Sequence, residues 1–575
     1  MGPSAARRTT GPSAADSVVP RPVRIVERSG QLVTLGDPVR IAAPRQVVGE
    51  ARWFRRCLEE ATGMAVELVE PGQPAAVILD VDESAVSGGF GGFGGFGGSG
   101  GSRGSGGSRA GRTAGGYRLV AGGDRIAVTG TDPAGVFHGL QTLRQLLPDT
   151  ALRRAPTTAP GAPDGAPPLA VEPVEIIDWP RFAWRGVHLD VSRHFLPKDF
   201  VLKLIDLAAF HKCNMVHLHL TDDQGWRVPV DRYPRLVEVG AWRRRSPAGH
   251  ANQHRYDAVP HGGFYTKADV GEMVAFAASR HVTVVPEIDL PGHVVAALAA
   301  YPELGNTGQR FEVASDWGTS PHVLNLEETT VRFCTDVLDE VADLFPGRWL
   351  HIGGDECPTD EWEHSPRARQ LMADHGYRRP RQLQGWFAAR LAGHLARAGR
   401  VPVAWDDLLD AGAPPGMVVM AWRGVPGGVA AAAAGHDVVM APQQWLYFDW
   451  SQSDDPAEPL ALRGSTPVEK VYGYDPLAGL PEEHHHHVLG AQCQLWTEYV
   501  ATPAAAEYQY FPRLCAFAET VWSPPPADGE PRRYGEFRPR LARHLGRLAA
   551  LGVNFRPLDG PTPGQARVWR GETGT

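Results

Sequence analysis

Residues 179 to 522 alternate between short runs of apolar, often β-branched residues and longer segments in which apolar residues have helical spacing. Such alternation is typical of parallel strands joined by helices. Eight strands in one such series predict a closed (β/α)8 TIM barrel, an α/β fold, over residues 176–560. The eight runs are WRGVHLDV, NMVHLHLT, VTVVPEID, WLHIGGDE, VPVAWDD, MVVMAW, DVVMAP and VLGAQCQLW.

Segments with helical spacing separate most of these runs, as crossovers between parallel strands require. The segments that separate the runs are KDFVLKLIDLAAFHK, KADVGEMVAFAASRH, TTVRFCTDVLDEVADLF and RQLQGWFAARLAGHLARAG. Another segment, PAAAEYQYFPRLCAFAETVW, follows the eighth run and is expected to be the final barrel helix.

Before the barrel, the pattern is mixed and predicts a small α+β accessory domain over residues 21–175. Asp132 comes directly before a proline and an apolar stripe, which is the pattern of a helix N-terminus. Residues 117–130 are expected to form a hairpin that turns at Gly122 and Gly123. The other expected elements are strands within 31–44, 64–71 and 75–82 and a helix over 51–63.

Two segments have too few apolar residues to offset the entropy of folding. Residues 1–20 are rich in Gly, Pro, Ser and Ala and are expected to be a disordered tail. Residues 87–116 form a Gly/Phe/Ser-rich insertion, which we interpret as a flexible surface loop between two strands. Residues 561–575, after the barrel, are expected to be a C-terminal tail.

Composition and charge exclude several classes of partner. The formal net charge of −8 offers no basic face for phosphates or anionic lipid, so neither nucleic acid nor a membrane is expected as a partner. No apolar core of a signal peptide and no run of 18 apolar residues is present, so we expect a cytoplasmic location. The six cysteines form no C-x-x-C pair and are expected to be buried thiols rather than zinc ligands.

Polar and aromatic residues gather where the predicted strands end, which in a barrel is the mouth that carries the active site. A mouth rich in carboxylates and tryptophans suits a sugar, whose apolar faces stack on indoles, although roughly half of the 16 tryptophans are expected in the barrel core. The residues at these ends are Asp190, Arg193, His194, Asp222, Asp223, Glu287, Asp289, His293, Asp355, Glu356, Trp405, Asp406, Asp407, Trp422, Trp496 and Glu498.

Asp355 and Glu356 follow two glycines at the end of the fourth predicted strand. Glycosidases usually place an acid and a second carboxylate on opposite sides of the anomeric carbon, which neighbouring residues cannot easily do. One interpretation is that only one of the two is the acid, and that a substrate 2-acetamido group supplies the nucleophile while the other carboxylate orients the amide. Solvated charge or helix capping is the alternative, but glycines at a strand end often mark the close approach of a ligand.

From about residue 20 to the final barrel helix, the sequence resembles glycoside hydrolase family 20, the β-N-acetylhexosaminidases. The motifs that carry the resemblance are LDVSRHF, HLHLTDDQGWR, PEIDLPGH, HIGGDE and LWTE, in this order and at family-like spacing. The resemblance implies an accessory domain before the barrel, no metal, no organic cofactor, and β-linked N-acetylhexosamine oligosaccharides or glycoconjugates as substrates. It also implies a retaining reaction through an oxazolinium intermediate. The insertion at 87–116 is not part of the family pattern.

The resemblance also implies a role for each site residue. Glu356 would be the general acid and later the base, and Asp355 would hold the acetamido nitrogen. Asp222 and His293 would form a relay behind Glu356 that tunes its protonation. In the pocket, Arg193 would bind the sugar 3- and 4-hydroxyls, Asp449 and Glu498 the 4- and 6-hydroxyls, and Tyr447 the acetamido oxygen, with Trp405, Trp422 and Trp496 as the walls.

One segment departs from the family pattern. Several family members have another tryptophan where this chain has LALRGSTP, around Leu462 and Arg463. The resemblance therefore implies nothing about the preferred leaving group. The sequence also leaves open the natural glycan, the choice between gluco and galacto sugars, and the oligomeric state.

Two other classes of protein compete with a glycosidase. His217 and His219 have the H-x-H spacing of metal-dependent amidohydrolase barrels, but only His351 adds to them and no lysine ligand follows, so core hydrogen bonding is favoured. A carbohydrate-binding module without turnover is not favoured, because Asp355, Glu356 and Tyr447 are all present. Residues 484–487 are four consecutive histidines, and we interpret this segment as a solvated loop rather than a metal site.

Overall fold

The computed structural model describes residues 17–86, 114–155, 169–462, 464–526 and 529–569. Contacts divide the chain into two compact units, Met1–Arg181 with Ala518–Phe555 and Phe182–Phe517 with Arg556–Thr575. Within the described ranges, no helix is both long enough and apolar enough to cross a membrane. Five of the six cysteines are buried, as expected, and Cys57 is half-buried.

The first unit is built on a seven-stranded mixed sheet in the order β1-β9-β6-β7-β5-β3-β4. The expected hairpin is present, but its turn is Gly123-Asp124 because Gly122 is paired with Arg125. Gly123 has a φ of +67°, which glycine adopts without strain. The strands are β1 (Arg24–Glu27), β3 (Val39–Ala42), β4 (Val66–Val69), β5 (Val77–Val81), β6 (Tyr117–Gly122), β7 (Arg125–Gly130) and β9 (Val174–Asp178).

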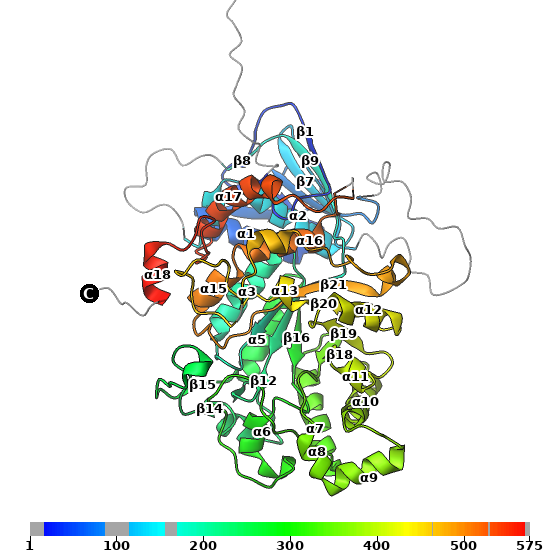
Figure 1. Ribbon diagram of the computed structural model, residues 1–575. Coiled ribbons are helices and arrows are strands. Elements are labelled where there is room, and N and C mark those ends of the chain that lie inside the picture. Colours follow the sequence, from blue (N-terminus) through cyan, green and yellow to red (C-terminus); the bar gives the residue numbers. More distant parts are fainter. Residues whose placement is uncertain (1–16, 87–113, 156–168, 463, 527–528, 570–575) are drawn as a thin grey trace, which may run out of the picture. The chain divides into compact units, whose positions relative to one another are not determined.

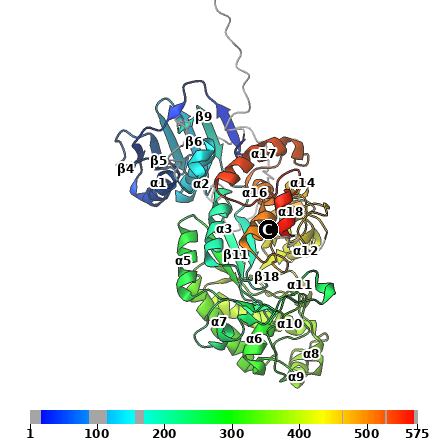
Figure 2. The same cartoon turned by 90° about the vertical axis from the view of Figure 1, so that its left-hand side faces the viewer.

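Two helices, α1 (Val48–Thr62) and α2 (Pro133–Leu146), pack on this sheet (Figure 2). Asp132 caps α2 as expected, because its carboxylate accepts a hydrogen bond from Gly135 N at 2.7 Å.

Two expected boundaries of the first unit change. β9 pairs with β1 and β6, so the boundary expected at residue 175 falls inside a strand of this sheet. The tail expected to run to residue 20 ends earlier, since Val18 and Val19 are fully buried. Residues 1–16 and 87–113, which contain the rest of that tail and most of the insertion, lie outside the described residues.

The second unit is a closed barrel of eight parallel strands, which confirms the predicted (β/α)8 fold (Figure 1). β10 pairs with β11 on one side and with β21 on the other, and this closes the barrel. Every strand lies within one of the predicted runs. The strands are β10 (Trp184–Asp190), β11 (Met215–His219), β16 (Thr283–Glu287), β17 (Trp349–His351), β18 (Val401–Trp405), β19 (Val418–Ala421), β20 (Val438–Met440) and β21 (Val488–Cys493).

The four predicted crossover helices are present as α3 (Lys198–Phe210), α5 (Lys267–Ala278), α7 (Glu328–Leu344) and α10 (Arg381–Arg397). The segment after the last strand is not one helix. It breaks at Pro512, because proline has no N–H to continue the helical hydrogen bonds, into α15 (Pro503–Tyr510) and α16 (Arg513–Trp522).

The ends of two other predicted segments also differ. The fourth strand stops at His351 rather than at Glu356, because Gly353 and Gly354 have φ values of +66° and +97° and turn the chain out of the sheet. The C-terminal tail expected from residue 561 contains a helix, α18 (Pro563–Trp569).

Candidate active site

The loops that follow the barrel strands bring the expected site residues together at one end of the barrel. Asp222 lies in β12 (Thr221–Asp222), directly after β11, and Tyr447 and Asp449 follow β20 and the short helix α13 (Gln443–Leu446). Arg193 follows β10, His293 follows β16, Asp355 and Glu356 follow β17, Trp405 ends β18, Trp422 follows β19, and Trp496 and Glu498 follow β21.

The glycines before Asp355 allow the backbone to pass tightly against Asp289. A Cβ atom on Gly353 would lie 1.7 Å from Asp289 Oδ1, and Gly354 N donates to the same oxygen at 3.0 Å. Glu356 then adopts a φ of +44°, a left-handed conformation that costs a non-glycine residue energy. The turn leaves the Asp355 side chain 13% exposed and the Glu356 side chain 46% exposed, so Glu356 faces the opening.

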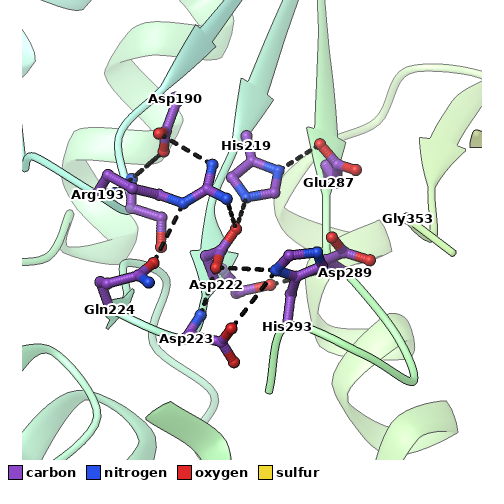
Figure 3. A network of polar contacts seen from close by, with 12 residues as sticks. Asp190, Arg193, His219, Asp222, Asp223, Gln224, Glu287, Asp289, His293 and Gly353 are labelled. Atoms are coloured by element: carbon purple, nitrogen blue, oxygen red, sulfur yellow. Dashed lines mark hydrogen bonds and ion pairs between the residues drawn. The ribbon is translucent and has the colours of Figure 1, made fainter. Parts of the chain in front are cut away.

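Asp222 is the centre of a buried ion-pair network (Figure 3). Its Oδ2 accepts from Arg193 Nη2 at 2.8 Å and from His219 Nε2 at 2.9 Å. Its Oδ1 accepts from Asp223 N at 2.6 Å and lies 3.2 Å from His293 Nδ1. Burial opposes the charge on Asp222, but Arg193 and His293 outweigh it and hold the pKa of Asp222 well below its usual value.

Glu356 is held as a carboxylate. His293 Nε2 lies 3.6 Å from Glu356 Oε2, and Thr319 Oγ1 donates to the same oxygen at 2.7 Å. The nearby His293, with a smaller contribution from the Thr319 hydrogen bond, lowers the pKa of Glu356 to about 2 against the effect of burial. Thr319 was not among the predicted site residues, because no sequence pattern connects an irregular segment to a side chain 37 positions away.

Asp355 experiences the opposite electrostatic environment. Burial raises the pKa of Asp355 well above its usual value, and the neighbouring Asp289 raises it further. Burial also raises the pKa of Asp289 to about 8. The buried Oδ1 of Asp355 has no hydrogen-bond partner among the described residues. Burial and Asp289 therefore favour the protonated form of Asp355, and one of its oxygens is available to a ligand.

Arg193, Asp449 and Glu498 form a group of interacting charged side chains within the site. Arg193 also contacts Asp190 Oδ2 at 3.3 Å, and its guanidinium lies 4.9 Å from the ring centre of Trp496. Burial would lower the pKa of Arg193, but Asp222 and other carboxylates raise it well above its usual value. Both carboxylate oxygens of Asp449 are buried without a partner among the described residues. Such oxygens are suited to accept hydrogen bonds from sugar hydroxyls.

The aromatic residues form one cluster beside these groups. Trp422 stacks on Tyr447 with ring centres 6.2 Å apart and planes 20° from parallel. Trp496 lies 6.3 Å from Tyr447 and 6.0 Å from Trp405. The Trp422 indole donates to Asp407 Oδ2 at 2.7 Å, a contact that strand spacing did not predict. The cluster offers apolar surface to a sugar ring and its N-acetyl group.

The barrel centre contains groups that could ligate a metal. His217, His351 and Glu287 place potential ligand atoms within 4.8 Å of one another. Glu287 accepts from Trp405 Nε1 at 2.8 Å and His217 Nδ1 accepts from Gln492 Nε2 at 2.9 Å, while His217 Nε2 and His351 Nε2 have no hydrogen-bond partner among the described residues. Both histidines of the H-x-H pair thus make hydrogen bonds in the barrel core.

Two further segments were singled out in the sequence. The histidine run at 484–487 forms most of a 3-10 helix, η8 (Glu482–His487), rather than the expected loop, and none of its residues is buried. Leu462 is half-buried, and Arg463 lies outside the described residues.

Comparison with known proteins identifies this architecture. The family model for the glycosyl hydrolase family 20 catalytic domain matches residues 182–525, and the model for domain 2 of that family matches residues 15–179. A β-hexosaminidase of Porphyromonas gingivalis is 40% identical over 443 residues, which are 76% of this chain but 54% of that protein, so this chain spans about half of its length. A β-N-acetylhexosaminidase of Cellulomonas fimi is 30% identical over 96% of this chain and 98% of its own length.

Solved structures agree with the sequence matches. A mutant Streptomyces plicatus β-hexosaminidase in complex with its product, GlcNAc, is similar with a TM-score of 0.76 and 31% identity. The similarity covers 96% of this chain and 97% of the Streptomyces chain. The likeness therefore includes both compact units.

Proposed function

Since this chain belongs to glycoside hydrolase family 20, we propose that it is a retaining exo-β-N-acetylhexosaminidase. Its substrates would be oligosaccharides or glycoconjugates that end in β-linked N-acetylglucosamine or N-acetylgalactosamine. The observation that carries this proposal is the pair formed by Asp355 and Glu356, adjacent carboxyl groups of which one is largely buried and the other nearly half exposed. The aromatic cluster around Tyr447 and the unpartnered oxygens of Asp449 support a sugar as the ligand.

In the first step, Glu356 protonates the glycosidic oxygen. Asp355 accepts a hydrogen bond from the acetamido N–H and so turns the amide oxygen toward C1, where it displaces the leaving group and closes an oxazolinium ring. Neighbouring carboxyl groups cannot lie on opposite faces of a sugar, which favours a nucleophile supplied by the substrate itself. In the second step, Glu356 removes a proton from water, which opens the ring with net retention.

The ligand-free site favours the reverse of the charges that this first step needs. Burial favours the protonated form of Asp355, and His293 and Thr319 favour the ionised form of Glu356, whereas the step needs an anionic Asp355 and a protonated Glu356. We infer that substrate binding shifts a proton from Asp355 to Glu356. His293 Nε2 lies 3.9 Å from Asp355 Oδ2 and 3.6 Å from Glu356 Oε2, a position from which it can assist this transfer. Displacement of Thr319 by the leaving-group oxygen would raise the pKa of Glu356 in the same direction.

Each of these steps uses only side chains of this protein, the substrate's own amide and water, and we propose that no metal or organic cofactor takes part. The test is hydrolysis of 4-nitrophenyl N-acetyl-β-glucosaminide, with 4-nitrophenyl β-glucoside as the matched substrate that lacks the acetamido group. The first sugar should be released rapidly and as the β anomer in an NMR time course, while the glucoside should be hydrolysed slowly or not at all. Equal hydrolysis of both substrates, or initial release of the α anomer, would reject this function.

A further inference from the structure

We propose that His219 and Glu287 are positioning residues that extend the relay behind Glu356 into the barrel. In this arrangement the His219 imidazolium, which stays charged, holds Asp222 between two residues (Figure 3). One is Arg193, which is proposed to bind the sugar, and the other is His293, which contacts the proposed acid Glu356. This inference rests on the proposed function and adds two residues to its site. The interactions run from Glu287 through His219, Asp222 and His293 to Glu356.

Both nitrogens of the His219 ring face carboxylate oxygens. Nδ1 lies 2.6 Å from Glu287 Oε2, and Nε2 lies 2.9 Å from Asp222 Oδ2. A neutral imidazole has a single N–H, so two such contacts to ionised oxygens require both nitrogens to be protonated. The ring is fully buried, and an unpaired cation there would be costly. Glu287 and Asp222 outweigh the effect of burial and raise the pKa of His219 to about 10.

The other groups around His219 do not compete for its charge. His188 on β10 lies 6.0 Å away, ring centre to ring centre, and His217 precedes it on β11. Burial lowers the pKa of both of these histidines, so both are neutral at pH 7. Asp289 lies near Asp222 and His219, and burial raises the pKa of Asp289 to about 8, so its protonated form predominates at pH 7. Glu287 and Asp222 are therefore the charges that decide the state of His219.

His219 also determines which way Asp222 faces. It shares Oδ2 of Asp222 with Arg193, and this leaves Oδ1 for His293. A single carboxylate thus connects the residue proposed to bind the sugar hydroxyls with the residue that contacts the acid. A positive charge beside a carboxyl group favours ionisation, so removal of the His219 charge should raise the pKa of Asp222 and, through His293, that of Glu356.

His217 provides a matched control. It is the same residue type, lies two positions away on the same strand, is equally buried, and has Nε2 3.1 Å from Glu287 Oε2. It accepts a hydrogen bond from Gln492 and, within the described part of the chain, forms no hydrogen bond or ion pair with Asp222 or His293. A purely structural role of the histidines in the barrel core would make the two substitutions equivalent, whereas a role through Asp222 would not.

The first test is the pH profile of kcat/KM for 4-nitrophenyl N-acetyl-β-glucosaminide. His219→Gln should lower kcat/KM at pH 7 about tenfold or more and move the profile to higher pH by roughly half a unit or more. His217→Gln should leave the limbs of the profile in place. Glu287→Gln should shift the profile in the same direction as His219→Gln, because it lowers the pKa of His219. Unchanged limbs in His219→Gln, or an equal shift in His217→Gln, would overturn the proposal.

The second test does not depend on variants that fold or on turnover. Side-chain ¹⁵N NMR of the wild-type chain should show both His219 nitrogens protonated at pH 7, with the signal assigned by through-space contacts between the His219 ring and its neighbour Trp496. A neutral His219 tautomer at pH 7 would overturn the inference. If the wild-type enzyme released no 4-nitrophenol, the proposed function would fail, and this measurement would still decide the charge of His219.

Discussion

Asp355 and Glu356 are adjacent in the chain but experience opposite electrostatic environments. Burial and the nearby Asp289 favour the protonated form of Asp355, whereas His293 and Thr319 favour the ionised form of Glu356. The difference arises from the backbone turn at the two glycines, which directs one side chain inward and the other toward the opening. Two neighbouring carboxyl groups can therefore take separate roles, one on the amide and one on the leaving group.

Glu356→Gln removes the acid and keeps the size of the side chain. We expect kcat to fall by about 10²- to 10⁴-fold with little change in substrate binding, because general acid catalysis contributes on that order. Steady-state kinetics on the 4-nitrophenyl substrate measure this loss. Glu363→Gln, at an exposed position of α8 (Asp360–His364), is the matched control and should retain the wild-type rate. A wild-type rate in Glu356→Gln would remove Glu356 from the mechanism.

Asp289→Asn tests the charge state at the base of the pocket through protein stability. The pKa of Asp289 is raised to about 8, so its protonated form stabilises the fold at low pH, and this contribution is lost as pH rises from about 4 toward 8. Asparagine stays neutral and keeps an oxygen to accept from Gly354 N. The melting temperature of wild type relative to the variant should therefore decrease across this pH window.

The control for this comparison is Asp343→Asn at an exposed position of α7. The difference in melting temperature between wild type and Asp343→Asn should stay constant from pH 4 to pH 8. If the difference between wild type and Asp289→Asn were constant from pH 4 to pH 8, Asp289 would not be a buried protonated carboxyl group.

At the level of elements, the strands were predictable and the loops were not. Strands of a parallel barrel are buried on both faces, so they are continuous apolar runs, and all eight were identified. The early end of β17 at His351 depends on positive φ values that a sequence pattern does not show. Pro512 does mark the break between α15 and α16, but the apolar pattern that continues through it suggested one helix.

The same distinction applies to the site. Strand-end residues such as Arg193 and Asp222 were predictable because parallel strands end at the same mouth. The contact between Thr319 and Glu356 and the contact between Asp407 and Trp422 depend on how irregular loops fold back, which local spacing does not encode.

Gly353→Ala tests whether the turn after β17 forms the site. The new Cβ would lie 1.7 Å from Asp289 Oδ1 and 2.6 Å from Asp289 Cα, and the backbone atom cannot rotate away. We expect a large loss of both kcat and the urea midpoint of unfolding. Gly376→Ala is the matched control, because Gly376 has a similar φ of +65° but nothing within 4 Å of the added atom. That control should cost only about 1–2 kcal/mol, the usual penalty of a left-handed residue. Equal effects of the two substitutions would contradict a tight approach at Gly353.

At the scale of the whole molecule, the site depends on closure of the barrel. Each of the eight strands is followed by, or ends in, at least one of the site residues. The Asp355–Glu356 pair follows β17, whereas the four residues of the aromatic cluster end or follow β18, β19, β20 and β21. Two neighbouring strands alone therefore cannot provide both. The site therefore requires the complete barrel, and a net charge of −8 over the chain agrees with a neutral sugar rather than a polyanion as its ligand.

Metal removal tests the proposed absence of a cofactor at this scale. The contacts of Glu287 and His217 are hydrogen bonds within the protein, so we expect prolonged dialysis against EDTA to leave kcat and the melting temperature unchanged. The control is a sample dialysed without chelator. Loss of activity that zinc restores would favour the metal-dependent alternative instead.

The most direct test of the account concerns the nucleophile. A series of 4-methylumbelliferyl β-glucosaminides with acetyl, fluoroacetyl, difluoroacetyl and trifluoroacetyl groups on the 2-amino nitrogen makes the amide oxygen progressively less nucleophilic with little change in size. If that oxygen attacks C1 while Asp355 orients the amide, kcat/KM should fall steeply with each added fluorine. A flat series would contradict the account, because the nucleophile would then belong to the protein or to water.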